Sequence, residues 1–357
     1  MGKGEITFVD QTGLDRHVAP FPEPHMEGFE NPIRIQMALR YLEENSVLEE
    51  TKRFKTPQAT REEALLVHSE YLVHSVELMS ELGGGQLGES AYASEHLMPS
   101  AMYALGGALF AADMVTSGVS RHAFALVRPP GHHATSSSSM GLCFFNNVAI
   151  AVRSILRNGE ARRVSILDID DHFGNGTAEI FYADPSVQFI SLHQYSFDGL
   201  GIGHFEEIGQ GEGLGTNVNI PLHEESSNLS YKIAINRIVV PAIESFRPDI
   251  IAVSAGYDAH FADPIGEMNV DSETYWYIAK SIDELVNSFG MQGSFWVLEG
   301  GYNPLMLGPS IRATLEGLRG KQCPLLEDQE KREKDASIVR KNQRIIRKIQ
   351  ETLSSYL

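Results

Sequence analysis

The sequence predicts an α/β protein in three layers, with a mainly parallel sheet between two layers of helices. Short apolar runs, rich in β-branched and aromatic residues, alternate along the chain with longer segments of helical periodicity. Most runs lack the period-two alternation of a half-exposed strand, as expected of strands that are buried on both faces. Polar, glycine-rich sequence follows each run directly, and no linker or repeat interrupts the pattern. We therefore expect a single domain over residues 1–320.

The expected strands and helices alternate in chain order, which is typical of a parallel sheet covered on both faces. At the amino terminus a few polar residues lead into a strand. Five further strands are predicted at residues 123–127, 164–167, 187–192, 250–254 and 295–298. Helices are predicted at residues 63–81, 99–116, 146–158, 229–245 and 272–288.

The last segment, residues 321–357, differs from the rest of the chain in its charge. From residue 331 onward it carries eight basic and three acidic residues. Four apolar side chains fall on one face of a helix in this segment: Ile338, Ile345, Ile349 and Leu353. We expect a basic C-terminal helix that packs on the domain through this face. A contact in a homo-oligomer, or a dock for an acidic partner, is the alternative.

The composition excludes several classes of protein. The chain has 357 residues, of which 42% are hydrophobic and 21% charged, so it is neither disordered nor collagen-like and can bury a large core. The 2 cysteines, Cys143 and Cys323, are too few for a disulfide scaffold. The net charge of −18 has the wrong sign for a protein that binds nucleic acid along its length. It keeps a protein in solution, and attraction of cationic substrates is a second interpretation.

The amino-terminal sequence does not resemble a targeting signal. It lacks the apolar run of a signal peptide, and Ile6 stands where a myristoylation site requires Ser or Thr. No window approaches the ~20 apolar residues of a membrane span. We expect a cytoplasmic protein that does not associate with membranes.

The polar segments that follow the strands should gather at one edge of the sheet, because ligands of open parallel sheets bind beyond the carboxyl ends of the strands. Asp170 and His172 follow the strand at 164–167, and Asp258 follows the strand at 250–254. Two carboxylates and one imidazole leave a fourth position open, which is typical of a catalytic zinc site. A surface loop that carries these residues without a metal is the alternative.

Two other short motifs could supply acid–base chemistry. The adjacent His132 and His133 could act as general base and general acid at neutral pH, although exposed loop histidines are the alternative. Tyr302 follows Gly300 and Gly301, whose permissive backbone could turn the phenol inward. A phenol in that place could stabilise an oxyanion; a turn that happens to contain a tyrosine is the alternative.

In their order and spacing, these clusters resemble the zinc-dependent histone deacetylase superfamily, which includes acetylpolyamine amidohydrolases and bacterial deacetylase-like amidohydrolases. The resemblance covers roughly residues 5–320 and is greatest to class II and bacterial members. It implies the arginase–deacetylase fold, with a mainly parallel sheet of eight strands. The matching segments are RPPGHHA (128–134), GLCFFNNVAIA (141–151), LDIDDHFGNGT (167–177), SLHQ (191–194), SAGYDAHFADPIG (254–266) and LEGGYN (298–303).

The resemblance implies catalytic roles for the matched positions. His132 and His133 would activate the water and protonate the leaving amine, and Tyr302 would hold the substrate carbonyl. Asp168 would be the partner of His132, and Asn175 that of His133. Because an anionic partner favours the imidazolium form and an uncharged amide does not, we expect His133 to be the base. The zinc ligands would be Asp170, His172 and Asp258.

The resemblance also implies residues around this centre. A monovalent cation, K⁺ or Na⁺, would be bound through oxygens, partly of the main chain, of Asp168, Asp170, His172, Ser191 and Leu192. The wall of the substrate tunnel would include Gly141, Leu142, Gly300 and Gly301. An acidic residue at the rim, near Glu89, would hold the substrate backbone.

Three positions depart from the family pattern. Phe173 replaces a second histidine, and Leu142 replaces an aromatic residue, which puts selectivity for a long lysine side chain in doubt. Asp171 adds a third acid to the metal segment, and we expect it to point into solvent; a contribution to the negative field at the metal is the alternative.

The leading hypothesis is zinc-dependent hydrolysis of an acylated amine, acetyl-lysine or a related amide, on a small molecule or a peptide. An acetylpolyamine or small-amide amidohydrolase is the alternative, although no clear polyamine-type insertion lies between Arg34 and His68. A catalytically silent protein that binds acylated molecules would be expected to lack a metal ligand or the tyrosine. In this sequence every matched catalytic position is filled. The paired histidines disfavour an arginase-like enzyme, and no G-x-G-x-x-G supports a nucleotide site. Iron(II) could replace zinc.

Overall fold

A parallel sheet of eight strands lies at the centre of the computed structural model, which describes residues 6–197, 201–324 and 336–356. Its strand order is β2-β1-β5-β10-β9-β6-β7-β8, and every neighbouring pair is parallel. The expected α/β class and eight-stranded sheet are thus confirmed. The strands are β1 (Ile6–Asp10), β2 (Thr51–Lys55), β5 (His122–Leu126), β6 (Val164–Asp168), β7 (Val187–Gln194), β8 (Asn217–Leu222), β9 (Ile250–Ala255) and β10 (Ser294–Leu298).

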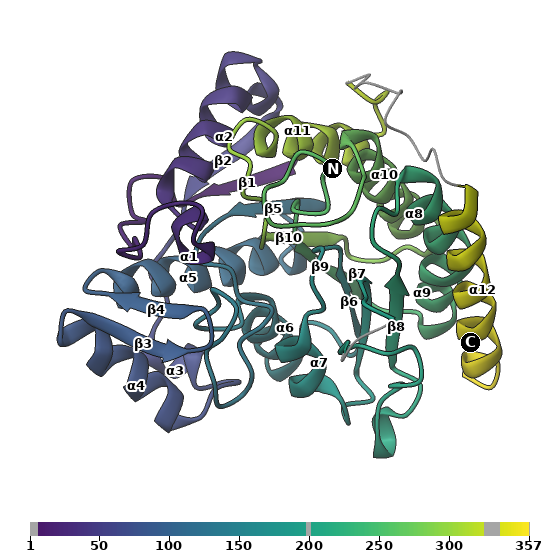
Figure 1. The fold of residues 1–357 in the computed structure, drawn as a ribbon, viewed down its shortest axis with the longest axis horizontal. Helices are drawn as coiled ribbons and strands as arrows, with labels where there is room; N and C mark the ends of the chain where they lie inside the picture. The colour runs from purple at the N-terminus through teal and green to yellow at the C-terminus, as the bar shows by residue number, and fades with distance from the viewer. Residues whose placement is uncertain (1–5, 198–200, 325–335, 357) are drawn as a thin grey trace.

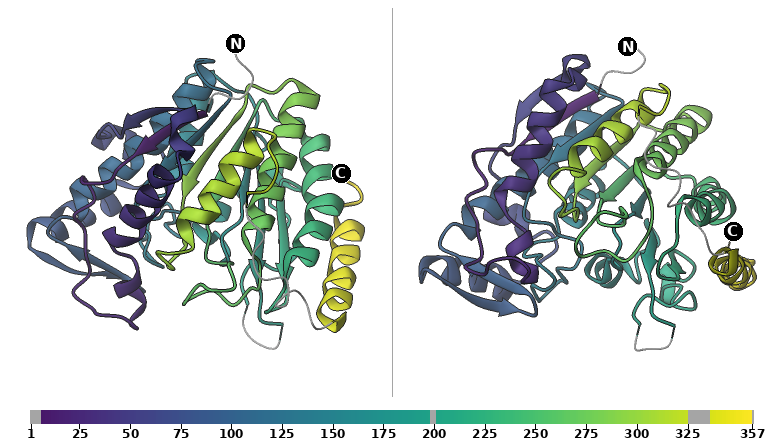
Figure 2. Two further views of the ribbon diagram at one scale, coloured as in Figure 1. Left: turned by 90° about the horizontal axis from the view of Figure 1, so that it is seen from above. Right: turned by 45° about the horizontal axis from the view of Figure 1, so that its top comes forward.

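Helices cover both faces of this sheet (Figures 1 and 2). On one face, α5 (Leu97–Thr116), α6 (Asn147–Arg157) and α7 (Asn175–Phe181) enclose one core cluster with alternate strand residues such as Val297. The intervening strand residues, such as Trp296, belong to a second cluster on the other face. The helices of that face are α2 (Pro32–Glu44), α8 (Asn228–Ala234), α9 (Val240–Phe246), α10 (Ser272–Phe289), α11 (Leu307–Leu318) and α12 (Ala336–Leu353). Period-two alternation thus divides the central strands between two buried faces.

Shorter elements flank these layers. The antiparallel hairpin of β3 (Gly84–Gly88) and β4 (Ala91–Ser94) forms a separate small sheet. The other short elements are α1 (Met26–Phe29), η1 (Val47–Glu50), α3 (Arg61–Ala64), α4 (Glu70–Glu81), η2 (Gly211–Gly213) and η3 (Ile235–Val239). Within the described residues, none of the helices has both the length and the apolar character needed to cross a membrane.

One predicted helix is divided in the structure. Residues 63–81 form the end of α3 and the whole of α4, with a break between them. The hydroxyl of Ser69 accepts a hydrogen bond from the N–H of Leu72 and so caps α4. In the break, His68 is buried and bonds to the carbonyl of Thr135 and the N–H of Asn146. Capping and tertiary contacts therefore outweigh the helical periodicity that the sequence shows there.

The C-terminal helix α12 packs on β8 and α8 through one apolar face (Figure 1). The buried side chains of this face include Ile345, Ile349 and Leu353. The amide of Asn342, also buried, donates hydrogen bonds to the hydroxyls of Ser226 and Ser230. The basic side chains of this helix are exposed: Arg340, Lys341, Arg344, Arg347 and Lys348. Residues 325–335 and 357 of the C-terminal segment lie outside the described residues.

The order of the strands brings the polar segments together. Five adjacent strands, β5, β10, β9, β6 and β7, end at the same edge of the sheet. In this register, Asp168 at the end of β6 lies opposite Ser191 of β7 and Ser254 of β9. The segments after these strands therefore enter one crevice, which is the usual ligand position in a parallel sheet.

Candidate metal centre and active site

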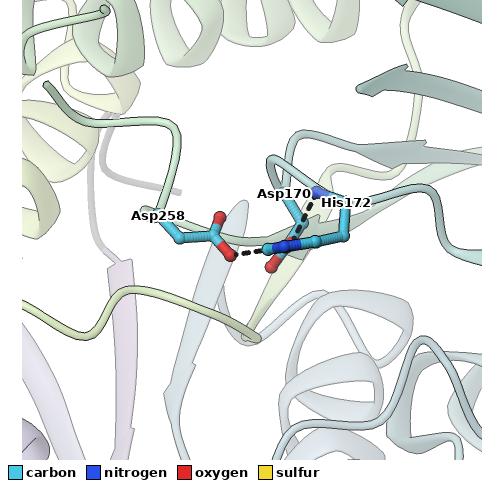
Figure 3. Close-up of side chains that lie close together, drawn as sticks. All are labelled: Asp170, His172 and Asp258. Atoms are coloured by element: carbon cyan, nitrogen blue, oxygen red, sulfur yellow. Dashed lines mark hydrogen bonds and ion pairs between the residues drawn. The ribbon is translucent and has the colours of Figure 1, made fainter. Parts of the chain in front are cut away.

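Asp170, His172 and Asp258 form a compact group at this edge (Figure 3). One ligand atom from each lies within 4.8 Å of the others. His172 Nδ1 is 3.2 Å from Asp170 Oδ1 and 3.1 Å from Asp258 Oδ2. Asp170 and His172 come from the segment after β6, and Asp258 from the segment after β9.

The chemistry of this group fits a divalent cation. Asp170 and Asp258 are each 1% exposed, so two like charges are held close together away from water. Burial and the charge of Asp170 raise the pKa of the Asp258 carboxyl well above its usual value. A cation between the carboxylates would remove this repulsion, and two oxygens with one imidazole nitrogen are ligands that zinc accepts.

Backbone groups hold the two carboxylates in place. The N–H of Gly300 donates to Asp170 Oδ2 at 2.9 Å, and the N–H of Asp171 donates to Asp258 Oδ1 at 2.8 Å. A Cβ atom at Gly300 would lie only 2.3 Å from Asp258 Oδ2 and 2.6 Å from Asp170 Oδ2. Glycine is therefore required there by the close approach of the two carboxylates that could bind a metal ion.

The tandem histidines lie beside this group, with ring centres 4.0 Å apart. His132 Nδ1 is 3.0 Å from Asp168 Oδ2, and His133 Nδ1 is 2.6 Å from Asn175 Oδ1. Because both partner atoms are acceptors, Nδ1 carries the proton on each ring. On both rings Nε2 is therefore the nitrogen that remains for chemistry.

The two imidazoles differ in their charge. Burial disfavours the cation at His132, but the carboxylates of Asp170 and Asp168 overcome it and raise its pKa to about 10. Burial, together with the positive charge of His132, lowers the pKa of His133 well below its usual value. The proton is thus held more tightly by His132 than by His133.

Tyr302 lies in the segment after β10 and lines the same cavity. The carboxylate of Asp263 accepts hydrogen bonds from the N–H groups of Tyr302, at 2.7 Å, and Asn303, at 3.2 Å. The guanidinium of Arg34 lies 5.3 Å from the centre of the Tyr302 ring. Burial raises the pKa of the Tyr302 phenol well above its usual value, so that it keeps its proton as a donor.

A cavity of about 390 Å³ joins these groups to the surface. The expected tunnel residues Gly141 and Leu142 line it, with φ angles of +54° and +67°. Their N–H groups donate to the carbonyls of Glu89 and Ser90 in the turn of the β3–β4 hairpin, at 2.9 and 2.7 Å. Glu89 itself is exposed and lines the cavity.

The other expected wall residues, Gly300 and Gly301, are not among the residues that line the cavity. Gly300 adjoins the carboxylates of Asp170 and Asp258, and Gly301 has a φ of +113°. The remaining wall includes apolar residues that the sequence did not single out: Met26, Met140, Ile202 and Ile265.

The residues expected at a monovalent cation site are also neighbours. Asp168, which is fully buried, lies opposite Ser191 across the β6–β7 pair, and Leu192 follows on β7. Asp168 Oδ1 accepts a hydrogen bond from the N–H of Asp170 at 3.1 Å. The hydroxyl of Ser191 lies 2.9 Å from His193 Nδ1.

The structure corrects the expectation for Asp171. Its side chain is buried, with 1% exposed, and does not point into solvent. Its Oδ2 accepts a hydrogen bond from the N–H of Glu267 at 3.1 Å, while Oδ1 has no partner among the described residues. Phe173, the other departure in this segment, is buried against the rings of Phe189 and His193.

Two acids near the site were missed as functional residues. Glu299 is fully buried and contacts the turn that carries the tandem histidines, and Asp263 holds the segment of Tyr302. Glu299 is the first residue of the EGGY motif, and Asp263 lies in the segment 254–266. Their positions within recognised motifs could have marked both acids as candidates in the sequence.

Comparison with known proteins identifies the family. A family model described as "Histone deacetylase domain" matches residues 28–318, which is most of the chain. This chain belongs to the histone deacetylase family. Its sheet and helices resemble those in the crystal structure of the HDA15 HD domain, with a TM-score of 0.88 and 27% sequence identity. That match covers 99% of this chain and 96% of the other, which confirms the expected fold.

Curated relatives of this histone deacetylase family member come from different organisms. A protein of Methanothermobacter thermautotrophicus named "Probable deacetylase" is 40% identical over 303 residues, which cover 84% of this chain and 88% of the relative. "Histone deacetylase 6" of Caenorhabditis elegans is 34% identical over 332 residues, or 89% of this chain. The match spans 34% of the length of the Caenorhabditis elegans protein, so this chain corresponds to one part of it.

Proposed function

We propose that this protein is a zinc-dependent hydrolase that removes an acyl group, most simply acetyl, from an amine such as a lysine side chain. The observation that carries the proposal is the convergence of three kinds of group on one cavity. These are the metal-binding group, the tandem histidines and Tyr302. Membership of the histone deacetylase family supports the same reaction class.

Asp170, His172 and Asp258 would hold the zinc. When bound, zinc supplies a Lewis acid that polarises the amide oxygen and lowers the pKa of a water molecule. Every other part of the proposed mechanism is assigned to side chains of this chain.

His133 is the general base. Its Nδ1–H donates to Asn175, so the lone pair of Nε2 is free to accept a proton from the attacking water. His132, held as a cation by Asp168 and Asp170, contributes a fixed positive charge beside the negative charge that develops on the amide. Once His133 has accepted this proton, His133 is itself an imidazolium and can give the proton to the departing amine.

Tyr302 would donate its phenolic proton in a hydrogen bond to the substrate oxygen. Because burial keeps the phenol protonated, the donor is present before the reaction begins and needs no rearrangement. Asp263 fixes the backbone on which this phenol is carried.

Acylated lysine in a peptide, an acylated small amine and an acylpolyamine share this reacting group. Exposed Glu89 beside the cavity favours substrates with a donor or positive charge near the entrance, which peptides and polyamines both offer. An acetylpolyamine amidohydrolase is therefore the second candidate.

Hydrolysis of a matched panel tests the function. The panel contains an acetyl-lysine peptide, a trifluoroacetyl-lysine peptide, N-acetylputrescine and N8-acetylspermidine, each assayed with and without a zinc chelator. We expect turnover that the chelator abolishes and added Zn²⁺ restores, with parallel samples reconstituted with Fe²⁺. No turnover of any member by folded, zinc-loaded protein would contradict the proposal.

A further inference from the structure

Glu299, at the carboxyl end of β10, joins three buried donors through its side chain. Glu299 Oε2 accepts hydrogen bonds from the N–H groups of Gly131, at 2.6 Å, and His132, at 3.1 Å. Glu299 Oε1 accepts one from the hydroxyl of Ser254 on β9 at 3.2 Å. The side chain is fully buried, so these donors have no access to water.

The main chain of Glu299 is fixed just as closely. Its N–H donates to the carbonyl of Ala255 at 3.1 Å, and its carbonyl accepts a hydrogen bond from Arg34 Nη1 at 2.9 Å. Three residues further along the chain lies Tyr302. Glu299 thus connects the turn that carries the tandem histidines to the segment that carries the tyrosine.

Main-chain carbonyl groups also hold the histidine turn to neighbouring segments, in addition to the side-chain bonds of His132 and His133 described above. The carbonyl of His132 accepts a hydrogen bond from the N–H of Thr177, and that of Pro129 accepts one from the amide of Asn147. Within the described part of the chain, Glu299 supplies the acceptor for the N–H groups of Gly131 and His132. Without this carboxylate, two buried donors would lack a partner, and a shift of the turn would be the way to relieve that cost.

We infer that Glu299 is a positioning residue, which sets the place of the His132 and His133 imidazoles relative to Tyr302. Glu299 does not line the cavity and so does not touch the substrate. Its effect on activity rests on the proposed function. Since proton transfer and oxyanion binding require well-aligned groups, a small shift of the turn lowers kcat far more than it weakens substrate binding.

Two substitutions separate the hydrogen bonds of Glu299 from its charge. Glu299→Met keeps the approximate length of the side chain and removes both acceptors. Glu299→Gln keeps an oxygen for the two N–H groups and presents an amide to Ser254. Glu316→Gln in α11 is the control, since it also replaces a largely buried, ion-paired acid but lies outside the cavity wall.

We expect Glu299→Met to lower kcat on the most active panel substrate at least tenfold, with KM within twofold of the unsubstituted protein. Glu299→Gln and Glu316→Gln should keep kcat within about threefold. Zinc content and thermal melting are measured on every variant. Normal kcat in zinc-loaded Glu299→Met overturns the inference. Equal losses in Glu299→Gln and Glu299→Met also overturn it, because charge and not hydrogen bonding would then matter.

A readout that does not need turnover distinguishes this inference from the proposed function. In ¹⁵N-histidine spectra, the side-chain resonances of His132 and His133 should shift in Glu299→Met and stay in place in Glu299→Gln. Those of the distant His122 should not move. If the unsubstituted protein hydrolyses nothing, the proposed function fails while the spectra still test the positioning role.

Ser254→Ala replaces Glu299→Met if the latter does not fold. It removes one of the three donors, and we expect a smaller loss of kcat, twofold to tenfold, with shifted His132 resonances. Unchanged resonances together with unchanged kcat in Ser254→Ala would overturn the inference.

Discussion

Replacing Tyr302 by phenylalanine removes one hydrogen-bond donor and little else. The ring and its contact with Arg34 remain, and the N–H bond to Asp263 does not involve the side chain. We therefore expect a normal fold and normal zinc content. Loss of one donor from an oxyanion site costs about 10²–10³ in kcat, equivalent to about 3–4 kcal/mol. The assay is steady-state hydrolysis of the most active panel substrate by zinc-loaded protein.

Tyr257→Phe is the matched control for this prediction. Tyr257 is also buried, but its hydroxyl bonds to Thr314 at 3.0 Å and does not line the cavity. This variant should lose about 1 kcal/mol of stability and keep its kcat. Tyr302→Phe should thus lose kcat and keep its fold, whereas Tyr257→Phe should lose some stability and keep its kcat. A Tyr302→Phe enzyme with kcat within threefold of the unsubstituted protein would refute the oxyanion role.

Three further substitutions test the metal-binding group, a buried histidine and the C-terminal helix. Gly300→Ala should reduce zinc content in metal analysis, because its Cβ would lie 2.3 Å from Asp258 Oδ2; full zinc occupancy would contradict this reading. His68 accepts a hydrogen bond from the N–H of Asn146, and burial lowers its pKa from 6.5 to about 4. The unfolded chain therefore binds the proton first, so stability is greatest above pH 6.5 and falls as the pH drops towards 4. Between pH 7.5 and 5, the loss of stability in urea unfolding should be about 2 kcal/mol smaller in His68→Gln than in the unsubstituted protein, because other buried histidines such as His17 and His193 contribute equally in both; equal losses in both proteins would exclude a contribution of His68. Ile349→Ala, in the buried face of α12, should cost about 2–5 kcal/mol in the same measurement; no change would mean that the helix contributes little to stability.

The central strands could be predicted from the sequence because they are buried on both faces and therefore uniformly apolar. The edge strands could not. The residues of β2 (TKRFK) are partly or fully exposed, and its polar sequence resembles a loop. At the other edge, β8 (NVNIPL) contains two asparagines and Pro221, and a proline normally argues against a strand unless the strand is at an edge.

The metal-binding group and the tandem histidines could be predicted because their identity and spacing are visible in the sequence. The buried residues that contact these groups from behind the cavity wall could not be predicted. The burial of Asp171 could not be predicted because Asp171 has no counterpart in the family pattern. Its burial depends on the loop around Gly266, where an added Cβ atom would lie 3.3 Å from the Asp171 Cγ atom. Glu299 acts on residues more than 160 positions away in the chain, and only the strand order brings them together.

The buried charges around the site lead to a prediction about stability. Asp168, Asp170, Asp171 and Asp258 are at most 1% exposed, and one oxygen of Asp171 has no hydrogen-bond partner within the described ranges. Without a bound cation, their mutual repulsion and desolvation oppose folding. A zinc ion bound as proposed would offset both, and binding to the folded state alone would stabilise that state. We therefore expect a chelator to lower the melting temperature.

Asp171→Asn tests the contribution of the extra charge. The amide can still accept the hydrogen bond from Glu267, while the carboxyl group, whose pKa burial raises to about 7, can no longer become negatively charged. Zinc affinity should fall by about tenfold, because changes next to metal ligands commonly have effects of that size. The metal-free variant should melt at a higher temperature than the metal-free unsubstituted protein. The gap in melting temperature between the zinc-bound and the metal-free form should therefore be narrower in the variant. A gap that stays the same or widens would mean that Asp171 does not add to the repulsion that the metal relieves.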